Sequence, residues 1–216
     1  MNDFAPVALH GLPAELPIGE RVLWQGRPDW RSLALHAFHV RKATIYFSLL
    51  LILKALIALS DGSSAASAIL SILWLMPLAV ACLAILSGLA FLSSRTTLYT
   101  ITSQRLVMRI GIALPITLNI PYRIVSAANL KVRSDDTGDI PLALTGSDRA
   151  AFTILWPHAR PWRVARPEPM LRSVPEAKKV AALLAEALGN ASEERLPIRQ
   201  PSASVEAVPL INTAYA

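Results

Sequence analysis

Two long apolar stretches, at about residues 43–59 and 66–92, dominate the pattern of hydrophobic and polar positions along this chain. Over residues 43–94 only Lys54 and Asp61 carry a charge. At about 1.5 Å per residue the stretches correspond to helices of roughly 25 and 40 Å, against a hydrocarbon core of about 30 Å. The pattern therefore predicts a transmembrane hairpin, in which the first helix barely spans and the second has length to spare for a tilt or bend.

Two other interpretations of the apolar stretches are weaker. A helical hairpin buried in a soluble core normally keeps a polar stripe, whereas residues 69–92 are apolar on nearly every face. A cleaved signal peptide is disfavoured because the first stretch begins only after residue 42 and no cleavage-type end follows it. We therefore predict that the hairpin is retained in the membrane.

Charged residues beside the hairpin predict its orientation. The connecting turn, residues 60–64, carries only Asp61, whereas basic residues lie on both outer flanks. By the positive-inside rule both long ends of the chain are cytoplasmic and the turn faces outward. The flanking basic residues are Arg21, Arg27, Arg31, Arg41 and Lys42 before the hairpin, and Arg95, Arg105 and Arg109 after it.

After residue 95 the pattern changes to short runs rich in Thr, Ile, Val, Leu and aromatic residues, separated by polar and glycine- or proline-containing breaks. Such runs predict the strands of an antiparallel meander. A further short strand is expected at residues 22–24, before the hairpin. The six predicted strands of the meander are 96–102, 105–110, 113–120, 124–132, 140–145 and 151–156.

A C-terminal helix is predicted to cover one face of this sheet. Ser173 and Glu176 have the spacing of a capping box, apolar residues then recur at helical spacing, and Gly189 is expected to end the helix. The predicted fold class is therefore an α+β membrane protein: a two-helix transmembrane hairpin plus a cytoplasmic antiparallel β-sheet or barrel, capped by a C-terminal helix.

Local composition and the positions of proline and glycine divide the chain into four segments. We expect a cytoplasmic lead-in with an interfacial helix at 32–42 (segment 1–42), the hairpin (43–92), one compact cytoplasmic domain (95–189) and a flexible tail (190–216). Five prolines and four arginines make residues 157–175 a stiff basic connector in this interpretation. With 53% apolar residues, the composition is high for a soluble protein and agrees with a membrane location.

The distribution of charge favours a membrane surface as the electrostatic partner. No Asp or Glu occurs from Gly62 to Ser134, and the formal charge of +6 lies mostly beside the hairpin, which favours anionic lipid over nucleic acid. Trp24 and Trp30 are expected either at the headgroup level or packed against the cytoplasmic domain, and the sequence favours neither position. The predicted membrane-surface or partner contacts are Trp24, Arg27, Trp30, Arg41, Lys42, Arg95, Arg105, Arg109 and Arg123.

Catalytic and metal-binding patterns are weak. The four histidines do not show the spacing of a helix-borne metal site, and the lone Cys82 lies inside the second apolar stretch. Residues 135–139 suit a hairpin turn better than a calcium loop, because no later glutamate follows at the required position. His36 and His39 are expected to contact headgroups, the alternative being bacteriochlorophyll or a metal. We predict no enzymatic activity and no resident metal or cofactor.

Several segments together resemble membrane-anchored bacterial pleckstrin-homology-like (PH-like) proteins, over about residues 16–188. They are Glu20–Pro28 (ERVLWQGRP), the hairpin, Tyr99–Leu106 (YTITSQRL), Ile120–Ile124 (IPYRI) and Thr137–Ile140 (TGDI). Within that family, the Trp- and Arg-rich lead-in, His39–Lys42 (HVRK) and Pro157–Trp162 (PHARPW) are most similar to the assembly proteins of the photosynthetic complex of purple bacteria, which are encoded beside the reaction-centre H subunit.

The resemblance implies a non-enzymatic factor that assists assembly of the reaction centre and core light-harvesting complex. Its location would be the bacterial inner membrane, in its intracytoplasmic or chromatophore form, and its partners would be nascent subunits of those complexes. The alternative is a general PH-like scaffold that binds anionic lipid or another membrane protein. A homodimer through Ser87, Gly88 and Ala90 is a further expectation.

Overall fold

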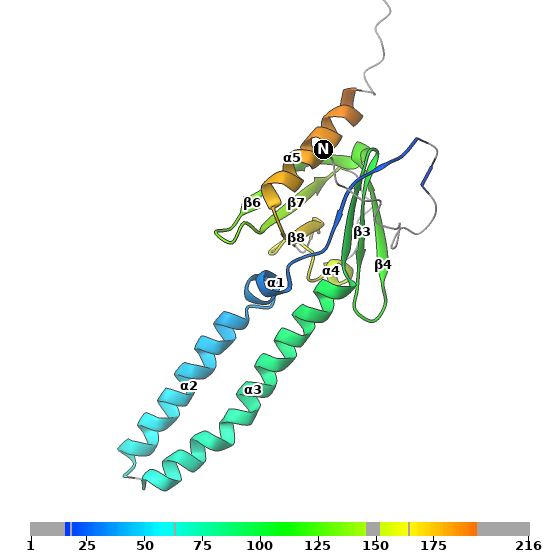
Figure 1. Ribbon diagram of the computed structural model, residues 1–216. Helices are drawn as coiled ribbons and strands as arrows, with labels where there is room; N and C mark the ends of the chain where they lie inside the picture. The colour runs from blue at the N-terminus through cyan, green and yellow to red at the C-terminus, as the bar shows by residue number, and fades with distance from the viewer. Residues whose placement is uncertain (1–15, 18, 63, 146–151, 164, 194–216) are drawn as a thin grey trace, which may run out of the picture.

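The computed structural model describes residues 16–145 and 152–193, apart from positions 18, 63 and 164. Figure 1 shows a pair of long helices that projects from one end of a β-rich domain. In chain order the elements are β1 (Val22–Gly26), α1 (Trp30–His36), α2 (Val40–Ser60), α3 (Ala65–Thr96), β2 (Leu98–Thr102), β3 (Arg105–Ile110), β4 (Ile116–Pro121), the 3₁₀ turn η1 (Tyr122–Ile124), β5 (Val125–Ala128), β6 (Lys131–Val132), β7 (Gly138–Leu144), α4 (Phe152–Leu155), β8 (Met170–Val174) and α5 (Ala177–Glu193).

The first sheet has the antiparallel order β1-β2-β3-β4. In this register Val22 lies opposite Thr102, and Leu98 lies opposite Arg109. Strands β1 and β3 confirm the strands predicted at residues 22–24 and 105–110. Strand β1 lies before the hairpin and β2 directly after it, so the helices α1 to α3 are an insertion between two paired strands.

The second sheet is built around β7, which pairs antiparallel with β5, β6 and β8. Helix α5 packs Val180, Leu184 and Ala187 into the core that both sheets share. Apolar residues repeat along α5 at helical spacing, which explains why one face is buried and the other is solvated. The antiparallel sheets and the covering C-terminal helix confirm the predicted α+β class.

The strand predicted at 151–156 is wrong, because its described part forms the short helix α4. Phe152 and Leu155 are three residues apart, so a helical turn directs both side chains to the same core, where Leu155 is fully buried. Trp156 then packs edge-on against Phe38, with ring centroids 5.3 Å apart. Pro157 follows and has no N–H to continue a strand ladder.

The capping box predicted for the last helix is also wrong. Ser173 belongs to strand β8, where its N–H donates to Asp139 Oδ1 at 2.9 Å. The helix begins only at Ala177, after Glu176 takes a positive φ of 49°, and it continues past Gly189 to Glu193. The predicted connector 157–175 therefore contains a buried strand and the buried side chain of Arg172.

Other predicted bounds shift by a few residues. The strand at 124–132 divides into β5 and β6, and the strand at 113–120 begins only at Ile116 because residues 111–115 form a turn. The interfacial helix expected at 32–42 ends at His36, and His39 takes a left-handed conformation (φ 53°) before α2 begins.

Helix α1 packs against the inner end of α3 rather than lying free. Leu33, Ala34 and Phe38 form a small apolar cluster with Ala90, which is fully buried. The small Ala90 side chain lets α1 approach α3 closely. A Cβ added at neighbouring Gly88 would meet no atom within 4 Å, so α1 does not cover this part of the small-residue face.

His158 joins α3, β2 and the segment after α4 inside the domain. Its Nδ1 lies 2.7 Å from the Tyr99 hydroxyl, and its Nε2 lies 3.0 Å from the hydroxyl of Thr97. The imidazole is 1% exposed. Burial, reinforced by nearby Arg172, lowers the pKa of His158 from 6.5 to about 3, so the ring is neutral in the folded protein.

We expect this neutral histidine to make stability fall in mild acid. The unfolded chain binds a proton near pH 6.5 and the folded protein does not, so stability is complete above that pH and declines below it, by up to about 1.4 kcal/mol per pH unit. Thermal unfolding of the detergent-solubilised protein at pH 7.5 and 5.5 measures the effect. His158→Gln should flatten this dependence and the control His36→Gln should retain it; an equal slope in both variants would contradict the assignment.

Candidate binding surface at the hairpin junction

Three arginines from distant parts of the chain meet where the hairpin joins the sheet. Arg27 follows β1, Arg95 lies in the last turn of α3 and Arg109 is on β3. All three are exposed and line one depression of about 330 Å³. The β2–β3 register explains the meeting, because Arg109 lies opposite Leu98, three residues after Arg95. We call Arg27, Arg95 and Arg109 the junction cluster.

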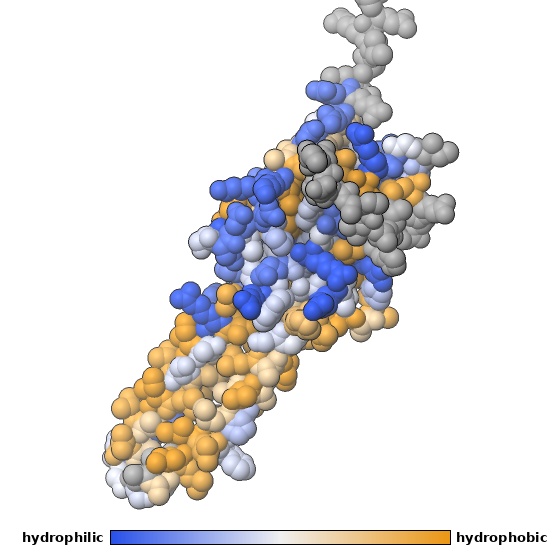
Figure 2. Space-filling view, viewed as in Figure 1, coloured by the Kyte–Doolittle hydropathy of each residue, from blue (hydrophilic) through white to orange (hydrophobic). Residues whose placement is uncertain are grey.

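An apolar turn borders the junction cluster. Gly111, at φ +113°, starts the turn between β3 and β4, and a side chain there would lie 2.3 Å from the carbonyl oxygen of Leu114. Leu114 is 80% exposed and Ile112 is also exposed. The turn lies at the hairpin end of the sheet in Figure 1, and Figure 2 shows an apolar surface there.

The two predicted tryptophans lie in different environments. Trp24, on β1, packs against the main core with its ring over Gly26. Trp30 begins α1, remains partly exposed and meets Phe91 of α3 edge-on, with ring centroids 6.1 Å apart. The structure therefore places Trp24 against the domain and Trp30 at the junction.

Arg105 and Arg123 lie at the opposite end of the first sheet from the junction cluster. Arg105 pairs in register with Pro121, and Arg123 follows in η1. Arg105 Nε and one terminal nitrogen donate to both carboxylate oxygens of buried Glu20, at 2.8 and 2.9 Å. Five of the predicted contact arginines lie outside α2, and the structure brings three of them together in the junction cluster. Arg105 instead forms an ion pair that connects Glu20 to β3.

Arg41 and Lys42 lie in the first turn of α2, away from the junction cluster. Beside them, the His36 ring nitrogen Nδ1 lies 3.0 Å from the carbonyl oxygen of Ser32. Burial, followed by the charges of Lys42 and Arg172, lowers the pKa of His39. Within the described residues no three His, Cys, Asp or Glu side chains are grouped to hold a metal ion.

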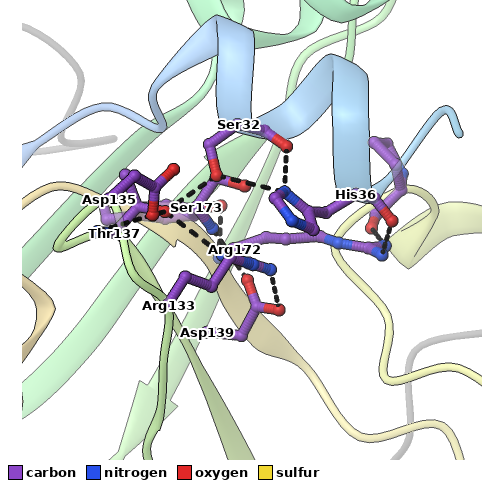
Figure 3. Close-up of polar contacts among 10 residues, drawn as sticks. Ser32, His36, Arg133, Asp135, Thr137, Asp139, Arg172 and Ser173 are labelled. Atoms are coloured by element: carbon purple, nitrogen blue, oxygen red, sulfur yellow. Dashed lines mark hydrogen bonds and ion pairs between the residues drawn. The ribbon is translucent and has the colours of Figure 1, made fainter. Parts of the chain in front are cut away.

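A polar network that the sequence analysis missed fastens α1 to the second sheet (Figure 3). The Ser32 hydroxyl lies 2.8 Å from that of Thr137, and Arg172 donates to the carbonyl oxygen of His36 at 3.1 Å. Below them, Arg133 pairs with Asp139. Hydroxyl and arginine residues far apart in sequence carry no local pattern that predicts such contacts; only the register of β6, β7 and β8 brings them under α1.

The helical hairpin itself is apolar on its outside. Both helices are long and apolar enough to cross a membrane. Of the most apolar 18 residues of each helix, 0% are buried in α2 and 6% in α3. An apolar groove of about 690 Å³ lies between them near the turn, and it contains Lys54 and Trp74. Lys54 is therefore presented beside a groove of leucine and isoleucine side chains.

Comparison with known proteins gives two matches. The family described as Bacterial PH domain matches residues 47–188 of this chain. A Rhodobacter capsulatus protein described as "Uncharacterized 23.7 kDa protein in puhA 5′region" is 38% identical over 203 residues, which cover 93% of this chain and 94% of that protein. No solved structure matches.

The contrast between Arg105 and Arg123 can be tested by stability. Arg105→Gln leaves the buried Glu20 carboxylate without its cation, so we expect a loss of about 2–3 kcal/mol in unfolding free energy. The matched variant Arg123→Gln, on an exposed turn, should change stability by less than about 0.5 kcal/mol. Chemical denaturation in detergent measures both. The double variant E20Q/R105Q should recover part of the loss, and equal stability of R105Q and R123Q would contradict the structural role of Arg105.

Proposed function

Because this chain belongs to the bacterial PH-domain family, we propose that it is a membrane-anchored, non-enzymatic binding module that assists assembly of the photosynthetic reaction centre and core light-harvesting complex. One observation carries the anchored-module part of the proposal. The apolar hairpin is inserted between two paired strands of the sheet, so the position of the domain is fixed relative to the helices.

The exposed faces of the hairpin support insertion into a bilayer. Helix α2 has 21 residues and the apolar part of α3 has 28, which correspond to about 31 and 42 Å. Large apolar side chains such as Leu56, Leu70 and Trp74 are more than half exposed along these helices. So large an apolar surface is unfavourable in water and favourable in lipid. Basic residues at the domain end of both helices support a cytoplasmic domain.

A binding role follows from the character of the domain. PH-like domains are generally non-catalytic binding modules, and exposed arginines and apolar side chains lie together at the hairpin junction of this domain. In this proposal the hairpin, with the groove that holds Lys54, contacts the membrane helices of a nascent subunit. The sheet domain contacts the cytoplasmic part of the same subunit.

We call the subunit that this protein would assist the client. The choice of reaction-centre and core light-harvesting subunits as the client comes from the resemblance of this chain to assembly proteins of purple bacteria. The similarity to the protein named for the puhA 5′ region is consistent with that choice, although that name states no function. A second candidate, a general scaffold on anionic lipid, is favoured by the junction cluster. Arg27, Arg95 and Arg109 lie beside the apolar β3–β4 turn, a combination suited to an anionic membrane surface.

The client is tested by purification of the tagged full-length protein from its native membrane in mild detergent. We expect mass spectrometry to find reaction-centre or core light-harvesting subunits, and a clean deletion to lower the amount of assembled complex without removing pigment synthesis. Lys54→Leu should reduce recovery of the client severalfold, with Lys178→Leu on exposed α5 as the matched control. Normal complex levels in the deletion strain would refute the assembly role.

The proposed position of the β3–β4 turn gives a second test. Leu114→Cys in a Cys82→Ser background, labelled with an environment-sensitive dye, should show blue-shifted emission in nanodiscs because the turn enters the headgroup region. Glu186→Cys, at an exposed position in the second half of α5, is the matched control and should report water, because α5 extends away from the hairpin in Figure 1. Identical, water-like emission from both labels would place the turn away from the membrane.

A further inference from the structure

A second basic region, separate from the junction cluster, lies between the α1–α2 connection and strands β6, β7 and β8. It is a cleft of about 920 Å³. Among the described residues that line it, Asp139 is the one carboxylate. Six cations line it: Arg41, Lys42, Lys131, Arg133, Arg160 and Arg172. We call this region the basic cleft.

Arg172 is the buried cation of the basic cleft. It is 8% exposed, and its terminal nitrogens donate to the carbonyl oxygens of Pro157 at 2.7 Å and His36 at 3.1 Å. Its Nε is buried without a hydrogen-bond partner in the described part of the chain. Its hydrogen-bond partners are neutral carbonyls, and burial lowers its pKa. The carboxylate of Asp139 acts on it in the opposite direction, but that carboxylate already pairs with Arg133.

The other cations divide into paired and unpaired groups. Arg133 pairs with Asp139, and Arg160 pairs with Glu168 at 2.7 Å. Arg41, Lys42 and Lys131 form no ion pair with any described residue and are exposed. Together with Arg172, four cations therefore line one cleft without an ion pair to any described carboxylate.

The start of α2 adds to the same positive potential. His39, at its N-cap, makes no side-chain cap hydrogen bond, and basic residues occupy the first turn. A helix N-terminus is the positive end of the helix dipole, so cations there are unfavourable unless an anion is near. The residues that normally stabilise such an end, Asp and Glu, are absent from this first turn.

The edge of the basic cleft is apolar. Leu35 and Trp162 both line it, and Trp162 is 97% exposed. The cleft also lies at the level where the apolar part of α2 begins, which is the headgroup level if the hairpin spans the bilayer. A free inorganic anion makes no apolar contact with an exposed indole or leucine side chain. A lipid also has glycerol and acyl groups, which can pack against these side chains.

We propose that the basic cleft binds the phosphate group of an anionic phospholipid from the cytoplasmic leaflet. Arg41, Lys42 and Lys131 contact the headgroup, and Arg172 supplies a fixed charge at the back of the cleft. This inference rests on the proposed membrane anchoring but not on the identity of the client. It assigns the lipid to the β6–β8 side of the domain, away from the junction cluster.

The test is retention of lipid by the full-length protein. Protein purified in neutral detergent is incubated with phosphatidylglycerol, phosphatidylcholine or inorganic phosphate, and bound lipid is counted by native mass spectrometry. We expect phosphatidylglycerol to be retained at least tenfold better than phosphatidylcholine, with little competition from millimolar phosphate. Full displacement by phosphate would show a free-anion site and overturn the lipid assignment.

Matched variants locate the site. R41Q/K42Q/K131Q should lose retention of phosphatidylglycerol at least tenfold, whereas R21Q/R123Q/K178Q removes three exposed charges elsewhere and should retain it. Lys131→Glu alone leaves the flank of α2 intact and should weaken retention severalfold. An equal loss in both triple variants would refute the cleft as the site. Membrane fractionation separates the two proposals: protein absent from membranes refutes the anchor, whereas anchored protein without selective lipid refutes only the cleft.

Discussion

The pairing of β1 with β2 is the constraint on which the rest of the structure depends. These two strands are neighbours in the first sheet, yet α1, α2 and α3 lie between them in the chain. Backbone hydrogen bonds along the strands therefore close a loop that contains the whole hairpin. Both ends of the hairpin are held by the same edge of one sheet, and motion of the helices relative to the domain would have to disturb that pairing or the packing of α1 on α3.

The buried polar groups reinforce this attachment and explain where the binding surfaces lie. His158 joins α3 and β2 through the hydroxyls of Thr97 and Tyr99, and Arg172 joins β8 to the end of α1. Polar groups buried without partners are costly, so each of these contacts favours one arrangement of the elements. The same arrangement leaves the Arg172 charge beside the basic cleft, where burial for structural reasons also creates an electrostatic site.

Basic residues in this protein have three different roles, which net charge alone does not distinguish. Arg105 neutralises a buried glutamate and holds the lead-in to β3. Arg27, Arg95 and Arg109 surround a depression at the junction, and Arg41, Lys42 and Lys131 surround the basic cleft. The two exposed groups lie on different sides of the domain, near the level of the helix ends. This distribution suits a module that is oriented on a membrane surface while its sheets remain available to a partner.

The sequence by itself determined the features that depend on local pattern. Long runs of apolar residues predicted α2 and α3, short runs rich in β-forming residues predicted β2 and β3, and the spacing along α5 predicted its buried face. It failed where packing outweighs propensity: α4 is helical because Phe152 and Leu155 share one core, and Ser173 belongs to a strand because Asp139 binds its N–H. Only the tertiary structure decided which cations share a site. Pairing of β1 with β2 brings Arg27 to Arg95, and attachment of α1 to the second sheet brings Arg41 to Lys131. No local sequence pattern shows which cations lie together, because the same arginine or lysine residue can face water, a carboxylate or a cleft.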